Sequence, residues 1–121
     1  MKEKAKFTKD PLVVTTADGK EKIVVDLRTV KRAALTLRAL NHPLRRKLLE
    51  LIESRGTITV TEIYQKLKIE QSVASQHLAI LRRAQVVTTK REGKKIHYSV
   101  NARRISEIVD LAKPLAQELD Y

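Results

Sequence analysis

The chain has 121 residues, no cysteine and a formal net charge of +11, and its hydrophobic residues, 42% of the total, are nearly all aliphatic. This length suits one small domain, and the lack of cysteine excludes disulfides, thiol redox chemistry and cysteine metal sites in this chain. No run approaches the roughly eighteen apolar residues of a membrane span, and the basic N-terminus lacks the apolar core of a secretory signal, so we expect a cytoplasmic protein.

Residues 1–26 are expected to form an arm that precedes the main domain, residues 27–121. Residues 1–10 alternate lysine with small or acidic residues, and we expect them to be mobile. Pro11–Thr16 and Glu21–Asp26 are rich in Val, Ile and Thr and flank an Asp-Gly turn signal. This pattern predicts a small hairpin, with an extended arm as the alternative.

Two helices are predicted next. Asp26 can cap a helix over residues 27–40, and Pro43 suits the first turn of a second helix, which runs to about Ser54 and is ended by Gly56. The spacing of apolar residues predicts the buried stripe of each helix. The first stripe is Leu27, Val30, Ala34 and Leu37, and the second is Leu44, Leu48, Leu51 and Ile52.

A short helix and a longer one with two unlike faces follow. Thr59 and Glu62 have the capping-box spacing, which predicts a helix from about Val60 to Leu67. Two helices joined by three or four residues, the second with a polar outer face, form a helix-turn-helix. The second is the stretch Ile69–Ala84, whose inward residues recur at helical steps. They are Val73, Ala74, His77, Leu78, Ile80, Leu81 and Ala84.

The outer face of Ile69–Ala84 has the chemistry of a DNA-reading surface. It is small and amide-rich at its start and cationic at its end. Amides can bond a purine edge at two points, hydroxyls can bond bases or phosphates, and arginines can hold phosphates. A merely solvated face would more often mix Glu and Lys. We therefore predict base reading by Gln71, Ser72, Ser75 and Gln76, and backbone contacts by Arg82 and Arg83.

The β-branched runs Gln85–Arg91 and Lys95–Val100, joined by a glycine-centred turn, predict a second hairpin with a cationic tip. Between Arg82 and Arg104 there are eight cations and one carboxylate, that of Glu92. Clustering of this kind favours a polyanionic partner; a membrane surface is less suitable, since no helix is basic on one face and aromatic on the other. We expect backbone contacts from Lys90, Arg91, Lys94 and Lys95.

Asn101 can cap a last helix, expected from Ala102 to about Leu119. Pro114 should kink or break this helix near Lys113, because proline lacks an N–H donor and clashes with the preceding turn. The helix has more apolar surface than one core needs, which indicates a dimer. The expected seam consists of Leu27, Val30, Ala34 and Leu37 on the first helix, and Ile108, Leu111, Leu115 and Leu119 on the last.

This order of elements resembles the ArsR family of bacterial winged helix-turn-helix repressors. The resemblance is carried by ALNHPLRRKLLELI (39–52), TVTEIYQKL (59–67), QSVASQHLAILRRAQVV (71–87) and REGKKIHYSV (91–100), about half of the chain. It implies a mostly α fold with a small β-hairpin wing, and a homodimer joined through the first and last helices. It also implies a recognition helix in the major groove, a wing at the backbone or minor groove, and release of DNA on a signal, often a metal ion.

The sequence departs from the family's pattern at three points. Glu70 stands where the family often has a capping serine, and His42 stands where Asp is common before proline, although an imidazole nitrogen can still cap. The family's cysteine pair beside the third helix is absent, and the last helix has carboxylates, those of Glu107, Asp110 and Glu118, but no histidine. The best-known sensing sites therefore do not carry over, and we predict no metal and no cofactor.

The three histidines, His42, His77 and His97, are distant in sequence, whereas zinc needs three or four converging ligands. His77 lies on the inward side of its helix and matches the family's structural histidine, so packing is favoured over ligation. A site borrowed across a dimer from His42 or His97 with a carboxylate is the weaker alternative. No nucleophile–base set and no glycine-rich phosphate loop are evident, so we predict that the chain is not an enzyme.

The favoured function is a sequence-specific transcription repressor that binds double-stranded DNA as a homodimer. A non-specific or architectural DNA-binding protein is one alternative, since charge alone would suffice for it. A winged-helix protein-interaction module is another, but it predicts an apolar patch where this chain has cations. The inducer is predicted to be something other than a transition metal, such as a small-molecule effector between the helices, a partner protein or the repressor's own abundance.

Overall fold

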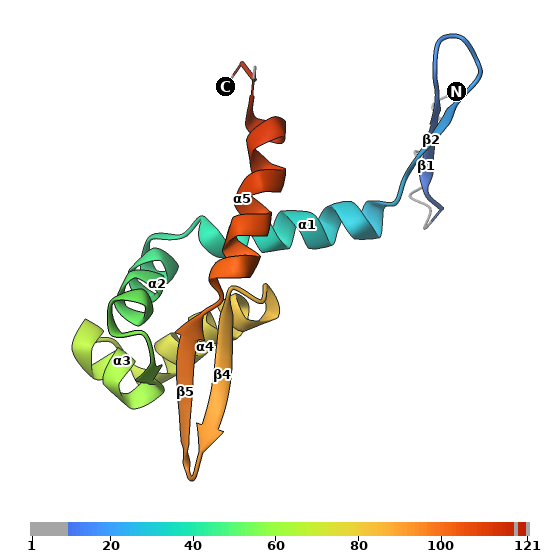
Figure 1. Cartoon of the computed structure of the whole chain (residues 1–121). Helices are drawn as coiled ribbons and strands as arrows, with labels where there is room; N and C mark the ends of the chain where they lie inside the picture. Colours follow the sequence, from blue (N-terminus) through green and yellow to red (C-terminus); the bar gives the residue numbers. More distant parts are fainter. Residues whose placement is uncertain (1–9, 118, 121) are drawn as a thin grey trace, which may run out of the picture. The chain divides into compact units, whose positions relative to one another are not determined.

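The computed structural model describes residues 10–117, 119 and 120, so the expectation of mobility for residues 1–9 lies outside the described residues (Figure 1). The chain divides into two compact units, the first extending to Leu35 and the second beginning at Thr36. The division into an arm, residues 1–26, and a DNA-binding domain, residues 27–121, stays a prediction. Among the described residues, no helix is long and apolar enough to cross a membrane.

The first unit contains the predicted N-terminal hairpin. Strands β1 (Leu12–Thr15) and β2 (Lys22–Val25) pair antiparallel, and Gly19 in the turn between them adopts a φ of 73°. The Asp18 carboxylate accepts hydrogen bonds from the Thr16 hydroxyl at 2.6 Å and from the Lys20 amide at 3.0 Å. These bonds stabilise the turn and lower the pKa of Asp18.

Helix α1 (Leu27–Leu40) begins in this unit and has the predicted bounds. The Asp26 carboxylate caps it by accepting a hydrogen bond from the Arg28 amide at 3.0 Å. The stripe predicted to be buried is instead exposed in the chain, and the buried residue of α1 is Ala39. The spacing of the apolar residues identifies an apolar face correctly, but it does not show whether that face is covered within the chain. The exposed residues of the stripe are Leu27, Val30, Ala34 and Leu37.

The second unit contains the hydrophobic core, which is formed by the helices of a helix-turn-helix and by a small sheet. The helices are α2 (Pro43–Arg55), α3 (Val60–Leu67), α4 (Gln71–Arg83) and α5 (Ala102–Ala116). The strands β3 (Ile58–Thr59), β4 (Val87–Glu92) and β5 (Lys95–Val100) form an antiparallel sheet in the order β3-β5-β4. The β4–β5 hairpin, here called the wing, projects away from the helices (Figure 1). The largest fully buried side chains are Leu48, Ile52, Ile58, Ile63, Leu78, Leu81 and Val86.

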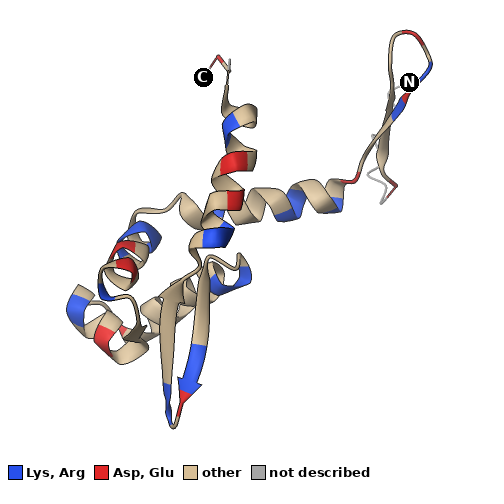
Figure 2. Cartoon of the chain, in the orientation of Figure 1, with Lys and Arg blue, Asp and Glu red and all other residues tan. Residues whose placement is uncertain are grey.

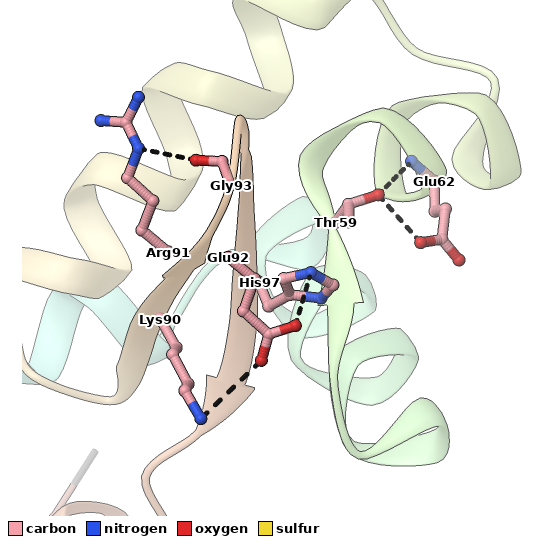
Figure 3. A network of polar contacts seen from close by, with 7 residues as sticks. All are labelled: Thr59, Glu62, Lys90, Arg91, Glu92, Gly93 and His97. Atoms are coloured by element: carbon pink, nitrogen blue, oxygen red, sulfur yellow. Dashed lines mark hydrogen bonds and ion pairs between the residues drawn. The ribbon is translucent and has the colours of Figure 1, made fainter.

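The predicted helix caps are confirmed. His42 Nδ1 accepts a hydrogen bond from the Leu44 amide at 3.1 Å, and Asn101 Oδ1 accepts one from the Arg104 amide at 3.2 Å. The Thr59 hydroxyl accepts from the Glu62 amide at 3.3 Å and donates to the Glu62 carboxylate at 2.9 Å, which lowers the pKa of Glu62 (Figure 3). These local bonds satisfy amides that have no partner within their own helix.

Three details differ from the sequence-based prediction. The strand β3 was not predicted, because two residues are too short to show an alternating pattern. The first wing strand begins at Val87, since Gln85 has a φ of 64° and belongs to a turn. Helix α5 is not broken near Lys113 but continues through Pro114; it ends at Ala116 rather than at the predicted Leu119, so Leu119 is not part of the helix. Pro114 lies in an exposed final turn, where water can satisfy the carbonyl that loses its partner.

Arg45 is a buried cation that connects three helices. Its side chain is on the same stripe of α2 as Leu48 and Ile52, and the residue is only 6% exposed. Its Nε donates a hydrogen bond to the Ala39 carbonyl, and its Nη2 donates to the Arg38 carbonyl, each at 2.8 Å. Its Nη1 lies 3.2 Å from His77 Nδ1 on α4. A positive charge at the C-terminal carbonyls of a helix is electrostatically favourable.

We predict that Arg45→Lys lowers the free energy of unfolding by about 2 kcal/mol or more, because an ammonium group cannot reproduce the planar fork and leaves buried carbonyls unsatisfied. Urea denaturation measures this change. The matched control is Arg46→Lys, since Arg46 is exposed and its ion pair with Glu50 lies on the surface. That control should change the stability by less than about 0.5 kcal/mol, and equal effects of the two substitutions would refute the structural role of Arg45.

Candidate nucleic-acid interface

The turn before α4 fixes where that helix begins. Lys68 adopts the left-handed conformation, with a φ of 55°. The Ile69 amide donates to the Tyr64 carbonyl at 3.1 Å and the Lys68 amide donates to the Gln65 carbonyl at 3.3 Å, which is the Schellman pattern at the end of α3. Glu70 then occupies the N-cap position of α4 without a side-chain hydrogen bond to the helix. The start of α4 is therefore set by the preceding turn rather than by a side-chain cap.

The end of α4 is fixed in a similar way. The Val86 amide donates to the Leu81 carbonyl at 3.1 Å, while Gln85 takes the left-handed conformation. The Arg104 Nε donates to the Ala84 carbonyl at 3.0 Å. Arg104, which counted among the clustered cations in the sequence, thus holds the end of α4 in place.

Helix α4 has the two faces that the sequence predicted. Ala74, Leu78 and Leu81 are fully buried on its inner face and pack into the core of the second unit. The polar outer face lies open to solvent, and its arginines form the last turn of the helix (Figure 2). The exposed residues are Gln71, Ser72, Ser75, Gln76, Arg82 and Arg83. An exposed face with this composition has donors and acceptors that suit base edges at one end and phosphates at the other.

A shallow hollow lies between α4 and the wing. It is lined by Ser75, Ala79, Arg82 and Arg83 of α4 and by Tyr98 of β5. The position of Tyr98 was missed, because sequence reasoning assessed the wing by its cations alone. In the sheet, Tyr98 pairs with Thr89 of β4 on one side and with Ile58 of β3 on the other. The second of these strands, β3, was not predicted from the sequence. A phenol and two guanidinium groups around one hollow provide several donors for an anionic ligand.

The wing carries the predicted cations on exposed positions. Figure 2 shows basic residues gathered towards its tip, and Figure 3 shows the contacts of Lys90 with Glu92 and of Arg91 with Gly93. The Arg91 Nε donates to the Gly93 carbonyl at 3.2 Å, which holds that side chain at the turn. The exposed cations are Lys90, Arg91, Lys94 and Lys95.

The single carboxylate of the wing is shared between two neighbours. Glu92 lies 3.7 Å from Lys90 Nζ and 3.8 Å from His97 Nε2 (Figure 3). No ion pair with Lys94 or Lys95 is found among the described residues. Lys94 and Lys95 therefore keep their positive charges at the tip of the wing without an ion pair among the described residues.

His77 has a structural environment rather than that of a metal ligand. Its ring centroid lies 4.8 Å from that of His42, and Arg45 contacts its Nδ1. Desolvation by burial, followed by the charges of His42 and Arg45, lowers the pKa of His77, so the ring is neutral near pH 7 and its Nδ1 can accept from Arg45.

The acidic residues of α5 do not complete a metal site either. The Glu107 carboxylate is paired with Arg103 at 3.4 Å and with Arg104 at 3.8 Å, while Glu118 lies outside the described residues. In the described part of the chain, no three residues of the His, Cys, Asp and Glu types are grouped so that they could hold a metal ion.

The comparisons with known proteins identify the same segment. Residues 40–90 match the family model described as a helix-turn-helix domain. The chain is 32% identical to the transcriptional repressor PagR of Bacillus anthracis over 91 residues. This match covers 75% of this chain and 91% of PagR. It is 41% identical over 81 residues to a probable mercury resistance operon repressor of Streptomyces lividans, covering 67% of this chain and 64% of that protein.

Two solved structures show the same architecture. The crystal structure of PagR matches with a TM-score of 0.56 and 32% identity, over 71% of this chain and 98% of that one. An ArsR-like transcriptional regulator from Rhodococcus matches with a TM-score of 0.64 and 18% identity, over 75% of this chain and 85% of that one, which supports the fold alone. More than a quarter of this chain therefore has no counterpart in the PagR structure.

The lowered pKa of His77 predicts how stability depends on pH. As the pH drops through the ordinary pKa of 6.5, the unfolded chain binds a proton at this residue that the folded chain does not yet bind, so the free energy of unfolding falls from there down to the lowered folded pKa. The loss is complete once the pH is below the folded pKa. We predict that His77→Gln reduces this loss, as measured by urea denaturation at each pH. Parallel pH profiles for the two proteins would contradict the prediction.

Proposed function

The chain belongs to the ArsR family of winged helix-turn-helix transcriptional regulators, and on this premise we propose that it is a homodimeric repressor that reads a partly palindromic operator. It is a DNA-binding regulator, as its relatives are. One observation carries the proposal for the site: the exposed amide and hydroxyl face of α4 continues into Arg82, Arg83 and the hollow beside the wing.

In this proposal α4 lies in the major groove and the wing follows the DNA backbone. Gln71, Ser72, Ser75 and Gln76 read base edges, and the cations of α4 and the wing hold phosphates. The Tyr98 hydroxyl joins Arg82 and Arg83 as a donor to the phosphate that occupies the hollow. Arg91 is positioned at the turn of the wing, from which it can enter the minor groove.

The proposal of a dimer rests on apolar side chains that the chain leaves uncovered. Leu111 and Leu115 of α5 are 71% and 68% exposed, and the stripe of α1 is exposed as well. Ile108, assigned to the same seam, is 5% exposed in the chain's own core and has little surface to offer a second copy. A two-fold axis would place two copies of α4 one DNA turn apart, roughly 34–36 Å, and this spacing predicts a partly palindromic operator.

A gel shift tests the function directly. The purified chain should bind its own promoter region much more tightly than unrelated DNA of equal length and charge. A ratio of the two affinities near one would instead support the non-specific or architectural alternative, because phosphate contacts alone do not discriminate between sequences.

We predict that Gln71→Ala and Gln76→Ala each relax the preference at one operator position at a cost of about 1–3 kcal/mol, because each removes a two-point contact to a base. Selection of bound sequences from a random pool measures the preference. Gln65→Ala, an exposed glutamine on α3, is the control and should leave the selected sequence unchanged. If all three proteins select the same sequence, α4 is not the reader.

We predict that the double variant Lys94→Ala, Lys95→Ala weakens binding to all sequences alike and flattens the slope of log affinity against log salt by about two, one for each phosphate contact. Lys113→Ala on α5 is the control and should keep the native slope. A full slope in the double variant would show that the tip of the wing does not contact the phosphates.

We predict that operator affinity is the same within about threefold in a chelator and in micromolar zinc, nickel or cobalt. The residues present do not fit the family's metal sites, since the chain has no cysteine and the described acidic and histidine side chains form no group of three. Release of DNA is then caused by a small molecule, a partner protein or dilution of the repressor. A loss of binding with one ion that a chelator reverses would reveal a metal site.

A further inference from the structure

The N-terminal unit is folded but has no core of its own. None of the residues from 10 to 35 is buried, and only Thr16 and Val25 are half-buried. A two-stranded hairpin is marginally stable by itself in water and needs a third strand or a packed helix against its apolar face. The unit therefore requires a surface to cover it.

One face of the hairpin is wholly apolar. The register pairs Leu12 with Val25 and Val14 with Ile23, and residues directly opposite each other in an antiparallel pair share a face. The other face combines Val13 and Val24 with polar residues of the same strands. On the apolar face Leu12, Val14 and Ile23 are 54%, 45% and 50% exposed.

The net charge of the hairpin indicates which kind of surface could cover its apolar face. Residues 10–26 contain four carboxylates and two lysines, a net charge of −2 in a chain of +11. An acidic hairpin is repelled by DNA. Residues 27–40, which form α1, contain four cations and no carboxylate, a net charge of +4, next to the uncovered apolar stripe described above. Both the charge and the apolar surface of α1 complement the hairpin.

The chain connection favours the α1 of a second copy. Asp26 alone separates β2 from α1, and its side chain is engaged as the cap of that helix. Folding the hairpin back onto its own α1 would need a longer connection than this one residue. A second copy offers the same helix without that restriction.

We propose that the hairpin is a dimerisation arm whose apolar face, formed by Leu12, Val14, Ile23 and Val25, packs on α1 of a second copy. The proposal rests on the homodimer proposed above and adds a contact outside the helix-turn-helix match, which begins at residue 40. By two-fold symmetry each copy gives one arm and receives one. The acidic turn of each arm then lies near the cations of the helix that it covers.

Sedimentation equilibrium of the full chain without DNA tests the arm. The double variant Val14→Gln, Ile23→Gln should raise the dimer dissociation constant by at least about tenfold, because each of the two arms in the dimer loses two buried apolar side chains. The matched control is Val13→Gln, Val24→Gln on the opposite face, which should change it by less than about twofold. An unchanged constant in the first variant, with operator affinity intact, overturns the arm and leaves the repressor standing. A native chain that is monomeric at all concentrations overturns both.

A cross-link identifies the surface that the arm covers. Because the chain has no cysteine, Val14→Cys, Val30→Cys provides the only two thiols for a short bifunctional reagent. A covalent dimer is expected, and Val13→Cys, Val30→Cys should give much less of it. A covalent product of monomer mass would place the arm on its own chain, and no product would place it elsewhere; either result overturns the proposal.

Discussion

The contact that the rest of the DNA-binding unit depends on is the one between Arg45 and its three acceptors. Its guanidinium group joins the last carbonyls of α1 to the inner face of α4, through His77. A helix can present one face to DNA only if contacts on its opposite face keep the whole helix from rotating about its axis. Burial of the His77 ring, and then the charges of His42 and Arg45, lower the pKa of His77, so the ring that receives this contact is neutral near pH 7.

Most of the fold could be predicted because its signals are local. The caps at Asp26, Thr59 and Asn101, the bounds of α1 and the two faces of α4 each follow from residues a few positions apart. What could not be predicted depends on distant partners. The strand β3 exists only because β5 pairs with it, and the exposure of the α1 stripe cannot be read from its spacing, which marks an apolar face but not what packs on it.

The candidate site divides in the same way. The composition of the α4 face and the cations of the wing could be read from the sequence, because exposure follows from the helical period and from charge. The structure adds how these groups are distributed. Arg104 is used to hold the end of α4, Glu92 pairs with Lys90 and His97 and has no ion pair with Lys94 or Lys95, and Tyr98 faces the same hollow as two arginines.

The short strand β3 has a consequence for how the protein unfolds. Its pairing of Ile58 with Tyr98 closes a loop of about forty residues that contains α3, α4 and β4. Opening that loop at β3 exposes Ile58, one of the fully buried side chains that pack against α3 and α4 in the core. We therefore expect the amide protons of α3 and α4 to exchange together, in one cooperative opening of this loop.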